Sequence, residues 1–179
     1  MNNKISNEIG IRSHKPKIYI GSDHAGFAMK EELVPFIKNL GYEVVDCGAY
    51  KYDDNDDYPD FVVPVAKAVA LNPLNIRGII LGGSGQGEAI VANRFPNVRA
   101  TVYYGELGIF KKLNIIKLAR EHNDSNILSL GARFLTISLA KKAVKLWLLT
   151  HFSNEERHMR RIKIIEAVSR KVKHNLEFK

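Results

Sequence analysis

Short apolar runs alternate with segments of helical periodicity along this chain, and that alternation most constrains its fold. We predict strands at 17–21, 43–46, 78–81, 98–102 and 126–130, each followed by a helical segment. Apolar strands separated by helices are typical of a parallel sheet covered on both faces. The sequence therefore predicts an α/β protein, a three-layer α/β/α Rossmann-like fold with a five-stranded parallel sheet. Such sheets bind their ligands at the carboxyl ends of the strands.

The 179 residues fit one domain. Residues 1–16 are polar and aperiodic, so we interpret them as a disordered extension ahead of a single domain at 17–179, which ends in C-terminal helices. The one cysteine, Cys47, excludes an intramolecular disulfide and any cysteine-cluster metal site, and it suits a reducing compartment. No apolar run approaches the roughly 20 residues that span a bilayer. We therefore expect a cytoplasmic protein without a membrane partner.

The net charge of +8, from 27 basic and 19 acidic residues, taken alone suggests a polyanionic partner. Its distribution argues against one. Residues 18–140 carry 12 basic and 14 acidic side chains, whereas residues 141–179 carry 11 and 4. Because the body is slightly acidic and shows no recognised nucleic-acid motif, we expect no nucleic-acid partner. A nucleic-acid-binding protein that uses its basic C-terminal helix is the remote alternative.

The strongest local signal is the loop Gly82-Gly-Ser-Gly-Gln-Gly-Glu88, after the third predicted strand. Its glycines let the backbone approach a ligand closely, and N–H groups at a helix start can face an anion. A dinucleotide fingerprint needs glycine where Glu88 or Ile90 stands, and a P-loop needs lysine at 88. Amide donors beside a carboxylate suit proton removal next to a carbonyl. The alternative is a tight turn in which Glu88 only favours the helix dipole.

Two histidines and two arginines are further candidates. His24 follows the first predicted strand and His122 stands just before the fifth, and we expect both at the same edge of the sheet. Arg157 and Arg161 are four residues apart, hence on one helical face, where they can converge on a phosphate. The plainer alternatives are solvated surface histidines and a solvated basic helix.

Taken together, these segments resemble the ribose-5-phosphate isomerase B family, which includes the galactose-6-phosphate isomerase subunits. The resemblance runs from about 17 to 165. It rests on Gly21-Ser-Asp-His-Ala-Gly26, Asp46-Cys-Gly48, Asp57-Tyr-Pro59, the loop 82–88, Ala92-Asn-Arg94, Arg120-Glu-His-Asn-Asp124, Gly131-Ala-Arg133 and Arg157-His-Met-Arg-Arg161. It implies an aldose–ketose isomerase that needs no metal or organic cofactor, and a homodimer or dimer of dimers with active sites at the interface. The segment 103–117 is longer and more apolar than we expect for this family.

The resemblance also implies roles for individual residues. The catalytic pair is Glu88 and His122. His122 opens the furanose ring, and Glu88 is the base because the family uses either a cysteine just before the glycine loop or a glutamate at its end, and position 82 is glycine. The loop backbone forms the anion hole. The substrate-binding residues are Asp23, His24, Gly83, Ser84, Gly85, Gln86, Gly87, Asn123, Arg133, Arg157 and Arg161, with some of the arginines acting across the dimer interface.

The implied reaction interconverts D-ribose 5-phosphate and D-ribulose 5-phosphate, a step of the pentose phosphate pathway. Glu88 would take the C2 proton and return it to C1 through a cis-enediol. Isomerisation of a hexose 6-phosphate, such as allose or galactose 6-phosphate, is the alternative. We prefer the pentose because the galactose-6-phosphate enzymes work as two unlike subunits, whereas this chain carries a full set of site residues. A sugar-phosphate sensor that binds without turnover is a further alternative.

Overall fold

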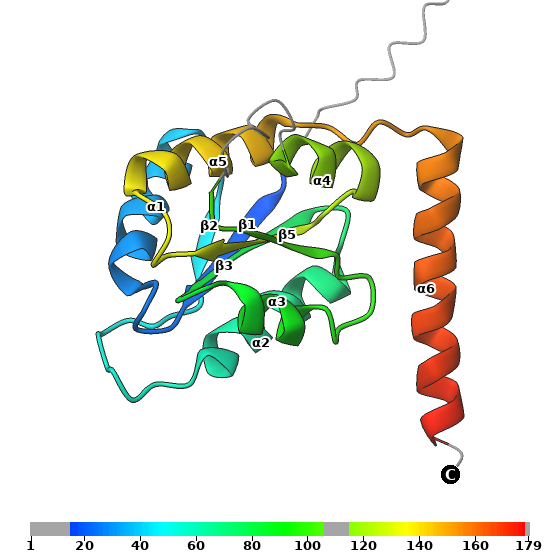
Figure 1. Cartoon of the computed structure of the whole chain (residues 1–179), viewed down its shortest axis with the longest axis horizontal. Helices are drawn as coiled ribbons and strands as arrows, with labels where there is room; N and C mark the ends of the chain where they lie inside the picture. The colour runs from blue at the N-terminus through cyan, green and yellow to red at the C-terminus, as the bar shows by residue number, and fades with distance from the viewer. Residues whose placement is uncertain (1–14, 106–114, 178–179) are drawn as a thin grey trace, which may run out of the picture.

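The computed structural model describes residues 15–105 and 115–177, with side chains described as far as residue 168. Its sheet has five parallel strands, as the sequence predicted, and their order is β2-β1-β3-β5-β4 (Figure 1). The strands are β1 Lys17–Ser22, β2 Val44–Asp46, β3 Ile76–Gly82, β4 Ala100–Tyr103 and β5 Ile127–Gly131.

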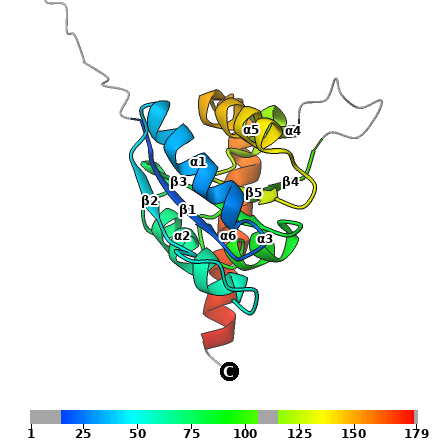
Figure 2. The ribbon, with the colours of Figure 1, turned by 90° about the vertical axis from the view of Figure 1, so that its left-hand side faces the viewer.

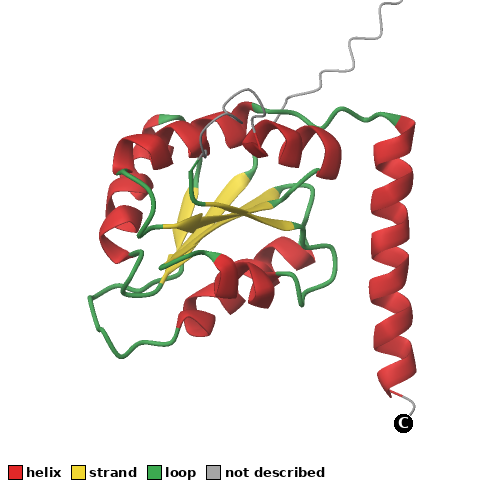
Figure 3. Cartoon of the chain, viewed as in Figure 1, coloured by secondary structure: helices red, strands yellow, loops and turns green. Residues whose placement is uncertain are grey.

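Helices cover both faces of the sheet (Figures 1 and 3). One face carries α1 Phe27–Asn39, α4 Ile115–Asn123 and α5 Ile137–Leu149. The opposite face carries α2 Tyr58–Leu71 and α3 Gln86–Ala92 (Figure 2). The expected three-layer arrangement is therefore confirmed. Because α1 and α3 leave neighbouring strands for opposite faces, a crevice forms at the carboxyl ends of β1 and β3, which is where such folds place their ligands.

The core lies on both sides of the central strands, whose buried side chains are mostly apolar. Ile18, Ile20 and Leu81 pack toward α1 and α5, whereas Ile80 and Ile127 pack toward α2 and α3. The regularly spaced apolar side chains of α1 and α2 are fully buried, namely Leu33, Ile37, Val62, Ala66 and Val69. Strands buried on two faces favour apolar side chains at nearly every position, which explains the apolar runs of the sequence.

The last helix, α6 Glu156–Glu177, stands beside the three layers (Figure 1). Met159, Ile164, Ile165 and Val168 expose between 39% and 56% of their surface on this helix. Within the described chain, α6 thus carries apolar side chains that its own subunit leaves uncovered.

Two predictions fall largely outside the described residues: the disordered extension 1–16, of which 15 and 16 are described, and the long apolar segment 103–117, of which 106–114 are not described. Among the described helices, none combines the length and the apolar character that a membrane span requires.

Candidate active site

The loops that follow β1, β3 and β5 meet at the carboxyl edge of the sheet and enclose a cavity of about 340 Å³. Seven residues that the sequence indicated line it: Asp23, His24, Gly83, Ser84, Gly87, Glu88 and Arg133. Ala25, Tyr58 and Phe134 complete the wall. The cavity therefore combines two carboxylates, a histidine, an arginine and the backbone of the glycine loop.

The glycine loop is fixed against β5. Gly85 has a φ of +77°, a left-handed conformation that glycine adopts without strain, and Ser129 Oγ donates a hydrogen bond of 2.6 Å to its carbonyl oxygen. The N–H of Arg133 donates to the carbonyl oxygen of Gly83 at 3.1 Å. Gly85 is buried toward β5 and Gln86 is exposed, and neither lines the cavity. The loop thus presents Gly83, Ser84 and Gly87 to a ligand.

Glu88 lies in the first turn of α3, and only 4% of its surface is exposed. Its carboxylate occupies the space that a Cβ atom at position 82 would need. A glutamate base at 88 and a side chain at 82 therefore exclude each other in this conformation. Burial raises the pKa of the Glu88 carboxyl, and the charge of Asp23 raises it further. A carboxylate whose pKa is raised toward neutrality is suited to general-base catalysis.

Asp23 and His24 lie in the turn between β1 and α1. Asp23 Oδ1 accepts a hydrogen bond from the N–H of Gly26 at 3.2 Å, and burial raises the pKa of the Asp23 carboxyl. His24 Nδ1 lies 2.7 Å from Asp56 Oδ1, and this hydrogen bond raises the pKa of His24. Across the cavity, the Arg133 guanidinium lies beside Gly83. Among the residues that line the cavity, His24 and Arg133 are the ones that can carry a positive charge, which the binding of a phosphate requires.

Asp23, His24 and Asp56 are also the group whose ligand atoms lie close enough together, within 4.8 Å, to suggest a metal site. The Nδ1–Oδ1 distance of 2.7 Å between His24 and Asp56 is that of a hydrogen bond. Two ligands of a tetrahedral zinc ion would lie about 3.3 Å apart, given metal–ligand distances near 2.0 Å. In the geometry seen, His24 and Asp56 bind each other rather than a shared ion.

His122 lies elsewhere, and the expectation that it shares an edge with His24 is wrong. It belongs to the last turn of α4, which leads into β5, so it stands at the amino edge of the sheet. A residue just before a parallel strand lies at the opposite edge from a residue just after one. Because β5 has five residues, it separates the two edges by roughly 15 Å. His122 and Glu88 of one chain cannot reach the same sugar.

Other site residues that the sequence predicted lie near His122, either at the amino edge of the sheet or on the nearby helix α6. The rings of His122 and His158 lie 4.4 Å apart, centroid to centroid. Arg157 is exposed, and its Nε donates a hydrogen bond of 2.8 Å to Glu155 Oε2. Arg161 is exposed as well. The expected site residues thus fall into two groups, one at each edge of the sheet.

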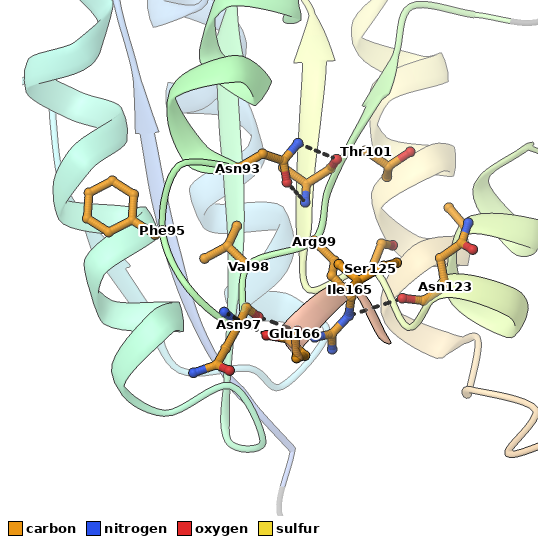
Figure 4. Close-up of a pocket in the computed structure, with 12 residues that line it drawn as sticks. Asn93, Phe95, Asn97, Val98, Arg99, Thr101, Asn123, Ser125, Ile165 and Glu166 are labelled. Carbon is orange, nitrogen blue, oxygen red and sulfur yellow. Dashed lines mark hydrogen bonds and ion pairs between the residues drawn. The ribbon is translucent and has the colours of Figure 1, made fainter. Parts of the chain in front are cut away.

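A second cavity, of about 360 Å³, lies at the amino edge and includes Asn123 (Figure 4). Arg99 organises it. Its guanidinium donates to the carbonyl oxygens of Asn123 and Asp124, and it forms ion pairs with Asp124 at 2.9 Å and Glu166 at 3.0 Å. Asn97 adds an N–H bond to Glu166. Through Arg99, these contacts link Glu166 of α6 to Asn123 and Asp124, which directly follow His122 in the chain.

Sequence reasoning assigned no role to Tyr58, Phe134 or Asp56. Tyr58 belongs to the Asp57-Tyr-Pro59 element, which carries the family resemblance but indicates no role for the tyrosine. Its ring fills the space beside Gly87. Phe134 follows Arg133 directly and is 64% exposed at the cavity. Asp56 is 32 residues from His24 in the sequence, and the sequence does not distinguish it from the four neighbouring aspartates.

The comparisons with known proteins agree with this geometry. Residues 18–165 match the family model described as Ribose/Galactose Isomerase. The chain is 37% identical to ribose-5-phosphate isomerase B of Mycolicibacterium paratuberculosis, over 86% of this chain and 92% of that protein. It is 36% identical to the Escherichia coli protein of that name, over 87% of this chain and 97% of that protein.

Solved structures give the same result. The structure of ribose-5-phosphate isomerase B from Mycoplasma genitalium with bound ribulose-5-phosphate superimposes with a TM-score of 0.80 at 36% identity, covering 86% of this chain and 96% of that one. The protein from Clostridium thermocellum superimposes with a TM-score of 0.78 at 40% identity, covering 87% and 99%. The chain therefore belongs to the ribose/galactose isomerase family.

Proposed function

We propose that this protein interconverts D-ribose 5-phosphate and D-ribulose 5-phosphate. The observation that carries the proposal is the Glu88 carboxylate, buried beside the glycine loop in the space that a side chain at 82 would fill. Its raised pKa suits a base that takes the C2 proton of the open-chain aldose and returns it to C1. A positioned acid/base group of this kind contributes about 10²–10⁴-fold to the rate.

The rest of the cavity supports the same reaction. N–H groups of the loop 83–87 would hold the enediol oxygen as charge develops on it, which contributes about 10²–10³-fold per donor. His24 and Arg133 supply positive charge for the phosphate, and the Asp23 carboxylate can accept a hydrogen bond from a sugar hydroxyl. The proton transfers assigned to Glu88 and His122 are complete without a metal or an organic cofactor, so we propose that the enzyme uses none.

We further propose that each active site is completed by a second copy of the chain. Glu88 and His122 lie at opposite edges of one sheet, so one ribose phosphate contacts both groups only where the carboxyl edge of one subunit meets the amino edge of another. His122, Asn123, Arg157 and Arg161 would come from the partner. The exposed apolar side chains of α6 are available to an interface of this kind. The assembly is a homodimer, or a dimer of such dimers.

We favour a pentose substrate. The solved Mycoplasma genitalium relative carries ribulose-5-phosphate, and the named relatives are ribose-5-phosphate isomerases. A hexose 6-phosphate such as allose or galactose 6-phosphate is the alternative. Comparing kcat/KM for ribose 5-phosphate and allose 6-phosphate decides between them, and a clear preference for the hexose would overturn the pentose assignment. Metabolism of such phosphates fits the cytoplasmic location that the sequence predicts.

The direct test is an assay of ribulose 5-phosphate formation from ribose 5-phosphate with a chelator present. We expect activity to survive chelation and Glu88→Gln to remain folded while kcat falls about 10²–10⁴-fold, since the base is lost and the shape of the side chain is kept. Near-wild-type turnover of Glu88→Gln would remove Glu88 from the mechanism. Activity that disappears with the chelator and returns with a divalent cation would contradict the cofactor-free proposal.

A further inference from the structure

Two side chains of the loop before α2 contact His24 of the active site, the Tyr52 ring and the Asp56 carboxylate, and only Asp56 forms hydrogen bonds with it. Asp56 Oδ1 accepts two hydrogen bonds from His24, one from its backbone N–H at 3.0 Å and one from ring Nδ1 at 2.7 Å. Its side chain is only 9% exposed. Among the described residues, Asp56 Oδ2 is buried and has no hydrogen-bond partner. The interactions of this carboxylate are thus concentrated on one residue, His24.

The contact fixes two properties of His24. Because Nδ1 faces a carboxylate at hydrogen-bond distance, it carries the proton, and the ring keeps one orientation. Nε2 is then the nitrogen left for the cavity that His24 lines. The second bond, to the backbone N–H, holds the turn between β1 and α1 as well as the ring, so the same carboxylate sets the position of both.

We propose that Asp56 is the positioning residue that orients His24 and keeps its imidazole in the protonated, phosphate-binding form. This inference rests on the proposed function, and it adds a residue outside the cavity wall. A charge-assisted hydrogen bond is about twice as strong as a neutral one, so an imidazolium binds a phosphate better than a neutral ring does.

The other charged groups around His24 act in both directions. The hydrogen bond to Asp56 is the largest influence and raises the pKa of His24, and the charges of Asp23 and Asp56 raise it further. Arg133, which faces it from the segment after β5, lowers it. Glu88 lines the same cavity, and the Tyr52 ring packs edge-on at 6.3 Å. Removing Asp56 leaves Arg133 in place, so the pKa of His24 should fall.

The matched variants are Asp56→Asn and Asp54→Asn. Both remove one negative charge from the same loop, but Asp54 is exposed and accepts a hydrogen bond from the side chain of the neighbouring Asn55. Asp56→Asn keeps the shape of the side chain and loses its charge. Asp56→Glu, which keeps the charge, serves as the conservative variant if the asparagine variant folds poorly.

The experiment titrates the His24 ring by NMR in the full-length protein and measures steady-state kinetics from pH 5.5 to 8.5. For wild type we expect a pKa above the ordinary 6.5. In Asp56→Asn we expect a lower pKa and a KM for ribose 5-phosphate about tenfold higher near pH 8, with kcat nearly unchanged. At pH 5.5, where both proteins carry an imidazolium, the two KM values should converge. Asp54→Asn should match wild type throughout.

An unchanged His24 titration in Asp56→Asn would overturn the inference even if the enzyme is fully active. A KM increase of the same size at every pH would overturn it too, because it would indicate general damage to the loop. If wild type shows no isomerase activity, the proposed function fails separately. Inorganic phosphate binding then takes the place of KM, with the same pH-dependent difference expected.

Discussion

The two edges of the sheet carry functional groups in different ways. At the carboxyl edge, Glu88 and Asp23 are buried with raised pKa values, and the glycine loop is hydrogen-bonded to β5. At the amino edge, Arg157 and Arg161 are exposed on a helix beside the sheet. The first edge is organised within its own subunit. The second presents cationic groups outward, as expected for residues that act on a neighbour's site.

The largest effect should come from filling the space that Glu88 occupies at the carboxyl edge. In Gly82→Ala the new methyl group overlaps the Glu88 carboxylate, so one of the two must move. We expect kcat to fall at least about 10²-fold, as for an acid/base group displaced by about 1 Å, and stability to fall by about 1–3 kcal/mol. Steady-state kinetics and urea unfolding measure both.

A double-mutant cycle provides the control. Gly82→Ala combined with Glu88→Ala removes the overlap, so the double variant should recover stability relative to Gly82→Ala while remaining inactive. Additive losses of stability in the double variant would show that the two positions do not compete for space.

At the amino edge, Arg161→Ala should raise KM for ribose 5-phosphate about 10- to 100-fold, because one hydrogen bond to a charged group is lost. For unphosphorylated ribose, the turnover of Arg161→Ala should equal that of wild type, because this sugar has no phosphate for Arg161 to bind. Arg160→Ala, an exposed neighbour on the same helix, is the matched control and should leave KM unchanged. Equal losses on both sugars would show that Arg161 does not recognise phosphate.

Glu88→Gln should reveal the energetic consequence of burying a base. A raised pKa means that the folded state binds a proton more tightly than the unfolded state, so the ionised carboxylate destabilises the fold above that pKa. The Tm of Glu88→Gln should equal or exceed that of wild type at pH 8. The difference should shrink as pH falls toward 4.5, the ordinary glutamate value. A lower Tm than wild type at pH 8 would contradict a raised pKa.

The smallest effect should come from the contact between α6 and the body. Glu166→Gln weakens an ion pair whose side chains are 15% and 18% exposed, and we expect a loss of about 1 kcal/mol or less, or about 2–4 °C in Tm. The exposed Asp54→Asn, outside any helix, should leave Tm unchanged. A large rise in KM without any change in Tm would instead assign Glu166 to the substrate.

Much of this organisation was predictable from the sequence because it depends on local order along the chain. The apolar strands predict a buried parallel sheet, and the glycine loop stands where β3 ends. Chain order also indicates the correct edge for His122, because a residue that precedes a strand lies at its amino end, whereas His24 follows its strand. Asp56 and Tyr58 could not be assigned from sequence, since their contacts are with residues far along the chain. The overlap of Glu88 with position 82 is likewise visible only in three dimensions.

The central claim is that Glu88 and His122 meet between subunits, and mixing two inactive variants tests it most directly. Glu88→Gln and His122→Asn are each purified, mixed in equal amounts, dissociated and reassembled. If the site is shared, half of the dimers are mixed and each has one intact site, so activity should return to about one quarter of wild type. If both groups act within one chain, no intact site can form. A mixture as inactive as its components, with mixed dimers demonstrated by mass spectrometry, would contradict the account.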